Sequence, residues 1–174
     1  MKYLVKFFVV TFFFIFSTQA IAEQKIVVLD MKYVLNSSKA GKGAQEILKN
    51  KFNDNAKEFT NLEKKLKQEE VDLLGKKTTL TKEEYSKKSD ELRKKVIDYQ
   101  SQRRTSLDKI AKQRAESRKT LIEKLKPIVD AYINENNISI VMDKKNMIGG
   151  LNEFDITKII VDKLDKEFPS LKLD

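Results

Sequence analysis

The stretch from residue 41 to residue 136 constrains the fold of this chain more than any other part. It has helical periodicity almost throughout, and the only break is a short run of turn-forming residues near 75–82. This pattern predicts two long helices folded back on one another. The flanking segments are short and rich in β-branched residues, so the hairpin should project from a small body. We therefore expect an α+β fold: a long antiparallel, coiled-coil-like helical arm on a small β-containing oligomerisation body.

The outgoing helix has apolar side chains at intervals of three, four and seven, the spacing of a heptad seam. They are Leu48, Phe52, Phe59, Leu62, Leu66 and Leu73. Two further seam positions, Asn55 and Glu69, are polar. We expect Gly75 to end this helix as a left-handed cap. Thr81 and Glu84 have the spacing of a capping box, which predicts that the returning helix starts there.

The returning helix is expected from Glu83 to about Glu135, with an apolar seam of its own. The seam consists of Tyr85, Leu92, Val96, Tyr99, Leu107 and Ile110. Between residues 111 and 120 the only apolar side chains are two alanines, which is typical of a helix that is held by neighbours or borders water. Pro127 lacks a backbone donor, so we expect a kink and a hinge where the arm joins the body. The alternative is a tolerated bend without a role.

The body should consist of residues 23–40 and 137–174. It contains two apolar runs typical of buried strands, Ile26–Leu29 and Ile138–Met142, which should pair although they come from opposite ends of the chain. A domain of this size is marginally stable alone, so neighbouring subunits should help to cover the strands. The expected interface residues are Ile26, Val28, Ile138 and Ile140.

The last part of the body predicts a turn, a loop and a helix. Residues 144–146 favour a turn, and residues 147–151 favour a weak third strand or a loop. Asp155 should act as the N-cap of a terminal helix. Its apolar face would be formed by Ile156, Ile159, Ile160 and Leu164. Pro169 should end this helix.

The N-terminal residues have the features of a cleavable signal peptide. Lys2 and Lys6 precede an apolar run at residues 7–16, and Ala20 and Ala22 have the spacing of a cleavage site. We expect export, with residues 1–22 removed by cleavage after Ala22. A membrane anchor is the alternative, but a spanning helix needs about 20 apolar residues, more than this run supplies.

The charge of the chain is concentrated on the arm. Residues 41–136 carry 24 basic and 17 acidic side chains, a surplus of seven. Residues 23–174 carry 33 basic and 26 acidic side chains, which is the same surplus. An exported protein meets little nucleic acid, so anionic lipid head groups and acidic polypeptides are the expected partners. Nucleic-acid binding is opposed by export and by the scarcity of aromatic stacking residues.

The residue types that are missing exclude several classes of function. The chain has no His and no Cys, which excludes Ser-His-Asp and Cys-His nucleophile systems, ordinary zinc sites and disulfides. Its five glycines form no phosphate-binding loop. We expect no enzyme activity, no metal and no cofactor.

The order of these patterns resembles the Skp/OmpH family of periplasmic chaperones over essentially the whole mature chain. Besides the signal peptide and the basic hairpin, the segments that carry the resemblance are Ile26–Met31, Val34–Gly41, Val141–Lys144 and Asp155–Thr157. The resemblance implies a periplasmic homotrimer whose arms enclose a cavity. It also implies an ATP-independent holdase that binds unfolded outer-membrane proteins and prevents their aggregation. Lipopolysaccharide is a further partner that it implies, although no arm motif aligns here.

Two roles for the arm remain open at this stage: a chaperone surface, or the spacer of a structural coiled-coil protein of the cell envelope. The polar seam positions favour the first, because a spacer would keep its seam apolar. For a chaperone, Phe52 and Phe59 either pack between the helices or face a cavity. The expected client contacts are Phe52, Phe59, Leu92, Tyr99, Lys112, Arg114, Arg118 and Lys119.

Overall fold

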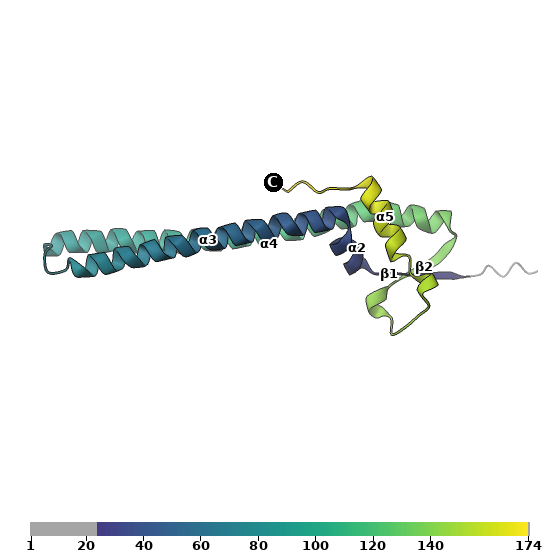
Figure 1. The fold of residues 1–174 in the computed structure, drawn as a ribbon, viewed down its shortest axis with the longest axis horizontal. Coiled ribbons are helices and arrows are strands. Elements are labelled where there is room, and N and C mark those ends of the chain that lie inside the picture. Colours follow the sequence, from purple (N-terminus) through teal and green to yellow (C-terminus); the bar gives the residue numbers. More distant parts are fainter. Residues whose placement is uncertain (1–23, 174) are drawn as a thin grey trace, which may run out of the picture.

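The computed structural model describes residues 24–173, so the expected signal peptide lies outside the described residues. Figure 1 shows two long helices that run side by side and a small body at one end of them. The elements, in chain order, are β1 (Lys25–Leu29), α2 (Met31–Ser37), α3 (Lys39–Gly75), α4 (Lys82–Glu135), β2 (Ile138–Asp143), the short 3-10 turns η1 (Lys144–Asn146) and η2 (Asn152–Phe154), and α5 (Thr157–Glu167). The α+β fold class is confirmed.

The tip of the hairpin confirms one predicted cap and corrects another. The amide of Glu84 donates to Thr81 Oγ1 at 3.2 Å, and the amide of Thr81 donates to Glu84 Oε2 at 3.0 Å, so the capping box forms. The left-handed cap at Gly75 is wrong, because no glycine of residues 24–173 has positive φ. Gly75 is the last helical residue, and the next two amides donate three residues back: Lys76 to the carbonyl of Leu73 at 3.1 Å and Lys77 to the carbonyl of Leu74 at 3.2 Å. Ordinary 3-10-type tightening therefore satisfies this helix end.

The two strands pair, as expected, and they run parallel to each other. Ile26 lies opposite Ile140, and Val28 lies opposite Met142. A third segment joins this sheet, because Asp155 forms a bridge with Val28 and the amide of Ile156 donates to the Val28 carbonyl at 2.9 Å. The sheet therefore ties both ends of the chain to the start of α5.

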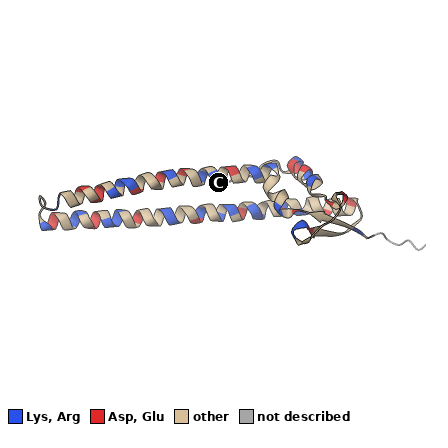
Figure 2. Cartoon of the chain, turned by 60° about the horizontal axis from the view of Figure 1, so that its bottom comes forward, with Lys and Arg blue, Asp and Glu red and all other residues tan. Residues whose placement is uncertain are grey.

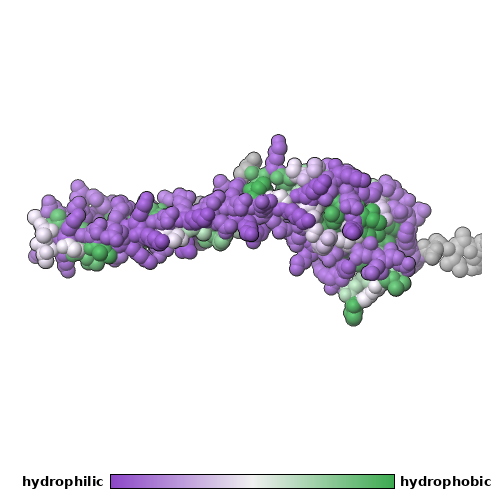
Figure 3. All heavy atoms as spheres, viewed as in Figure 1, coloured by the Kyte–Doolittle hydropathy of each residue, from purple (hydrophilic) through white to green (hydrophobic). Residues whose placement is uncertain are grey.

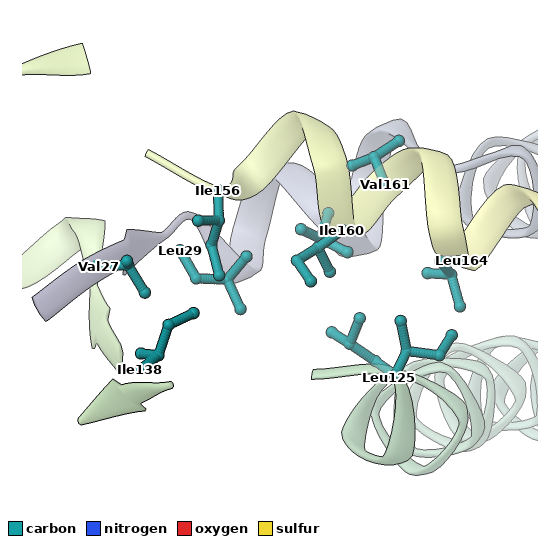
Figure 4. Packing of buried hydrophobic residues seen from close by; sticks show 10 residues of the cluster. Val27, Leu29, Leu125, Ile138, Ile156, Ile160, Val161 and Leu164 are labelled. Atoms are coloured by element: carbon teal, nitrogen blue, oxygen red, sulfur yellow. The ribbon is translucent and has the colours of Figure 1, made fainter. Parts of the chain in front are cut away.

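One main core holds the body together, and it draws on every helix and strand except α3. Figure 4 shows side chains of β1 and β2 facing side chains of α4 and α5. The buried members are Val27, Leu29, Val34, Leu125, Ile128, Ile138, Ile156, Ile160, Val161 and Leu164. Ile138, expected at a subunit interface, is thus covered by the chain itself. In α5, Val161 is buried in the core, although it was not expected on the apolar face. Ile159, which was expected there, is 44% exposed.

The start of the arm differs from the expected link at residues 36–43. Helix α3 already begins at Lys39, because Ser38 caps it: the Ser38 hydroxyl accepts from the amide of Gly41 at 3.2 Å. Gly41 is buried, and a Cβ atom placed on it would lie 1.9 Å from the carbonyl oxygen of Leu35. The absence of a side chain at Gly41 lets α2 turn tightly into α3.

The terminal helix starts two residues after Asp155, so Ile156 occupies the N-cap position assigned to Asp155. The Asp155 carboxylate still accepts from the first helical amide, that of Thr157, at 2.9 Å. The boundary is wrong by one residue, but Asp155 satisfies the same backbone donor that we expected.

Pro127 lies inside α4, and the helix continues on both sides of it. Its neighbours Leu125 and Ile128 are 1% and 4% exposed and belong to the body core. Leu121, which is also buried, packs against the body at Leu35 and Ala40. The arm therefore meets the body before the proline, and the hinge at Pro127 stays a prediction.

Candidate functional site

The arm is the candidate functional site, and polar contacts between α3 and α4 set its register. Figure 2 shows basic and acidic residues interspersed along both helices. The Asn55 amide donates to Ser106 Oγ, and Lys95 Nζ lies 2.6 Å from Glu69 Oε2. Both polar residues of the predicted seam therefore have a partner on the opposite helix. Such pairs fix the alignment of two helices at some cost in stability.

The middle of the arm is joined by an aromatic pair with a polar edge. The rings of Phe59 and Tyr99 meet edge to face, with 6.0 Å between their centroids. The Tyr99 hydroxyl donates to Glu63 Oε2 at 3.3 Å, and Lys67 Nζ lies 2.8 Å from Glu63 Oε1. The hydrogen bond from Lys67, aided by its charge and by Tyr99, holds the pKa of Glu63 below its usual range.

The four apolar residues expected to contact a client are not equally available. Tyr99 is only 9% exposed and Phe59 is half-buried, so both mainly pack the two helices together. Leu92 is half-buried and lines a groove of about 500 Å3 between the helices near the tip. Phe52 is 47% exposed. Of these aromatic residues, Phe52 alone offers a large apolar surface to a ligand.

Several exposed apolar residues of the arm were missed by the sequence reasoning. Val71 is 61% exposed, and Leu74 and Ile97 are 56% exposed. All three are apolar residues outside the seam that the heptad pattern defines. An apolar residue off the seam should face solvent, so the sequence could have identified them. Leu107 was placed on the seam but is 43% exposed, because its neighbour Ser106 takes the inward position opposite Asn55.

The four basic residues expected to act together fall into two pairs on different faces of α4. Residues four apart share a helix face, as Arg114 and Arg118 do, and residues seven apart do so as well, as Lys112 and Lys119 do. Lys119 pairs with Glu123 at 3.9 Å. Arg114 and Arg118 line a groove of about 750 Å3 where the arm meets the body. The quartet is therefore not one cluster.

The body carries its own exposed apolar surface, on the sheet face away from the core. Ile26 is 40% exposed, Ile140 is 49% exposed and Met142 is 39% exposed. The loop between β2 and α5 adds Ile148 and Leu151, at 109% and 66%. Figure 3 shows apolar residues gathered on the body and its loop, whereas the arm is hydrophilic apart from small patches. Of the expected interface residues, Ile26 and Ile140 are exposed, and Val28, at 6%, is buried by the chain.

Neither a metal centre nor a membrane span is found in the part of the chain that the structure describes. No three His, Cys, Asp or Glu side chains of residues 24–173 gather in a way that could hold a metal ion. Within the same range, no helix combines the length and the apolar character needed to cross a bilayer.

Comparison with known families places this architecture. The family model described as outer membrane protein (OmpH-like) matches residues 25–164. This range includes both strands and all the helices, apart from the last three residues of α5. The chain belongs to the OmpH-like family. No curated protein sequence matches the chain.

A solved structure shares the fold of this OmpH-like chain. A crystal structure from Caulobacter crescentus CB15, proposed to be an OmpH-like outer membrane chaperone, superposes with a TM-score of 0.81. The match covers 87% of this chain and 89% of that one, at 19% sequence identity. Membership of the OmpH-like family supports a chaperone role, and the solved structure agrees with that family in fold.

Proposed function

We propose that this OmpH-like chain is a periplasmic holdase that binds unfolded outer-membrane proteins without ATP and prevents their aggregation. The observation that carries the proposal is the surface of the arm. Exposed apolar side chains such as Phe52, Leu74 and Ile97 lie among basic side chains, and much of their area faces solvent. Such a surface suits weak, replaceable contacts with an unfolded chain, because no single contact is strong.

The same proposal includes assembly into a homo-oligomer, for which the resemblance suggests a trimer. The outer sheet face and the loop that follows it are apolar and exposed, which is typical of an interaction surface. Arms from several bodies joined in this way would enclose a shared cavity. Light scattering should find more than one subunit at micromolar concentration, and Ile140→Asp should dissociate the assembly because it would bury an unpaired charge. A folded wild-type monomer would contradict this part.

A second candidate, a structural coiled-coil protein of the envelope, stays open because of one observation. The polar seam residues Asn55 and Glu69 are paired across the arm, so they no longer distinguish a chaperone from a spacer. The deciding experiment is aggregation of an unfolded outer-membrane protein diluted from denaturant. A holdase suppresses light scattering at stoichiometric amounts, whereas a spacer leaves the scattering unchanged.

The basic surplus of the arm should set how fast clients are captured. Charge attraction between exposed groups fades as the Debye length shortens to about 3 Å near 1 M salt, whereas apolar contacts persist. Stopped-flow capture of an acidic unfolded client should therefore slow with salt, while binding weakens without being lost. Reversing all four charges, at Lys112, Arg114, Arg118 and Lys119, should slow capture at low salt in the same way. Association rates that do not depend on salt would show that the basic residues only keep the arm solvated.

Two further parts of the proposal have direct tests. Export and cleavage after Ala22 predict that the protein isolated from the envelope begins at Glu23, as N-terminal sequencing would establish. Anionic lipid or lipopolysaccharide is a second class of partner for the basic arm, and sedimentation with anionic vesicles, compared with neutral ones, checks it.

A further inference from the structure

The groove where the arm meets the body, which we call the base groove, has an unusual lining. Its volume of about 750 Å3 lies within the range of ~300–1,000 Å3 typical of ligand sites. The floor consists of small and apolar side chains. The buried floor residues are Leu35, Gly41, Ala44, Leu48, Ser117 and Leu121. The groove stays open because small residues line it on both α3 and α4. In the sequence, the opening corresponds to the low apolar content of residues 111–120.

The rim of the base groove is basic. Lys49, Arg114 and Arg118 line it, and Glu46 is its one acidic residue. None of the three basic residues forms a salt bridge among residues 24–173, so their charges are available to a ligand. An apolar floor beneath unpaired cations suits a ligand that is both apolar and anionic, because each part of it finds a complementary surface.

The chain's own C-terminal tail shows what kind of segment can lie against this floor. After α5 ends, residues 169–173 have no regular secondary structure and run back beside the arm (Figure 1). Leu171 packs against the buried cluster of Leu35, Ala40 and Leu121. Leu35 and Leu121 also line the base groove. A non-helical segment with spaced leucines therefore already covers the body end of the floor.

We propose that the base groove binds an extended polypeptide segment in which apolar residues alternate with acidic ones, and that the tail competes for the body end of the same site. The inference rests on the proposed holdase function and assigns a place and a sequence pattern to client recognition. In an extended segment, alternate side chains point to opposite sides. Apolar side chains can then enter the floor while the long side chains of Arg114 and Arg118 reach carboxylates on the other side. Strands of outer-membrane barrels alternate apolar and polar residues in this way.

The test measures binding of a short fluorescent peptide that alternates leucine with aspartate, by anisotropy at physiological salt. Arg114→Glu with Arg118→Glu should weaken binding about tenfold, since two favourable charge contacts become repulsive. The matched control is Arg104→Glu with Lys109→Glu, which makes the same change in net charge on the same helix away from the groove. The control should stay within about twofold of the wild type, because screening removes long-range effects beyond ~8 Å. Circular dichroism establishes that both variants keep their helices.

Two further measurements address the floor and the tail. Leu171→Ser should free the body end of the groove and tighten peptide binding. Because the chain has no cysteine, Gln45→Cys places a single thiol at the groove for a photoreactive label, and Gln102→Cys places one elsewhere on the arm. Gln45 should crosslink to the acidic peptide, and Gln102 should not.

Several outcomes would overturn the inference. Equal losses in the groove variant and its control would mean diffuse charge attraction without a site. Equal binding of a peptide that alternates leucine with lysine would remove the anionic pattern. Unchanged peptide binding in Leu171→Ser would mean that the tail does not compete for the groove. A Gln45 label that crosslinks only to a second copy would make the groove a subunit interface. The aggregation assay is separate: its failure refutes the holdase proposal, whereas loss of groove-dependent peptide binding refutes this site alone.

Discussion

The body and the arm of this chain use opposite means to hold their shape. The body contains a cluster of ten buried apolar residues drawn from five elements, β1, α2, α4, β2 and α5. From residue 48 to residue 110, the arm buries only four side chains: Leu48, Leu66, Tyr99 and Ile110. The links between the two arm helices are in good part polar. The body therefore specifies the fold, whereas the arm keeps most of its side chains available for contacts with other molecules.

This difference should be visible in how each region opens. Segments with few buried contacts open locally at lower free energy than a core does. The arm is therefore expected to exchange amide hydrogens faster than α5, although all three helices are continuous. Hydrogen exchange slower in the arm than in α5 would contradict this order.

The largest effect should come from truncating a leucine in each region. Leu164→Ala in the body, where the side chain is fully buried, should lower the free energy of unfolding by about 3–5 kcal/mol. Leu66→Ala in the arm, 8% exposed, should cost less than about 2 kcal/mol, because fewer apolar neighbours lose contacts. Urea unfolding followed by circular dichroism, at one fixed protein concentration, measures both.

Equal costs for the two leucines would contradict the comparison. A larger cost in the arm would mean that its seam, rather than the body core, dominates the stability of the chain.

Two glycines of α3 provide the next test, at the boundary between body and arm. Gly41→Ala would place a Cβ atom 1.9 Å from the Leu35 carbonyl oxygen, so the α2–α3 corner must shift at a cost of about 1–3 kcal/mol. Gly43 has open space around its Cβ position, and alanine there should stabilise the helix by up to about 1 kcal/mol. Thermal unfolding should shift in opposite directions. Shifts of the same sign would mean that the corner adapts without strain.

The glycine pair also shows what the sequence could and could not predict. The capping box of Thr81 and Glu84 and the pairing of the two strands follow from local patterns, and the structure contains both. The tight corner at Gly41 depends on a contact with the Leu35 carbonyl, which no periodicity reveals, so a loose link was expected there. The expected left-handed cap at Gly75 failed for a different reason: a glycine permits that conformation without requiring it.

The candidate site was predicted less well than the fold. A heptad pattern identifies which residues can face the partner helix, but small rotations of the helix decide which of two neighbours does so. Ser106 faces Asn55 and leaves Leu107 exposed. The division of the basic quartet between two faces could have been derived from its spacing. The low apolar content of residues 111–120 hinted at an opening, but the base groove itself could not be derived, because it depends on how α2, α3 and α4 meet.

A smaller effect should distinguish a charge that ties the body together from one that lies on the arm. Burial raises the pKa of Asp155, but hydrogen bonds from Lys144 and Thr157 outweigh burial and hold the pKa below the ordinary value of 3.8. The stabilisation is fully present above pH 3.8 and is lost as the pH falls through the lower pKa of the folded state. Asp155→Asn should therefore cost about 1 kcal/mol at neutral pH.

The pH dependence provides the check. The difference in free energy of unfolding between wild type and Asp155→Asn should shrink below pH 3.8. Glu63→Gln on the arm is the matched control, because its partner Lys67 is 71% exposed and water screens the pair. A larger effect at Glu63 than at Asp155 would reverse the expected order of the two regions.

The smallest effect on stability, and the most direct probe of motion, concerns Pro127. Alanine at this position would restore a backbone donor to the carbonyl of Glu123, four residues before it. That carbonyl lies on an exposed residue, so the free energy of unfolding should change little. The arm, however, should sway less about the body. Spin labels on Lys77→Cys at the tip and Lys145→Cys in the body, in an otherwise cysteine-free chain diluted with unlabelled protein, measure the distance distribution. It should narrow in Pro127→Ala and stay unchanged in the neighbouring control Lys126→Ala. Because Leu125 and Ile128, on either side of the exposed proline, belong to the body core, equally broad distributions in all three proteins would place the flexible point in the sparsely packed residues 111–120 instead.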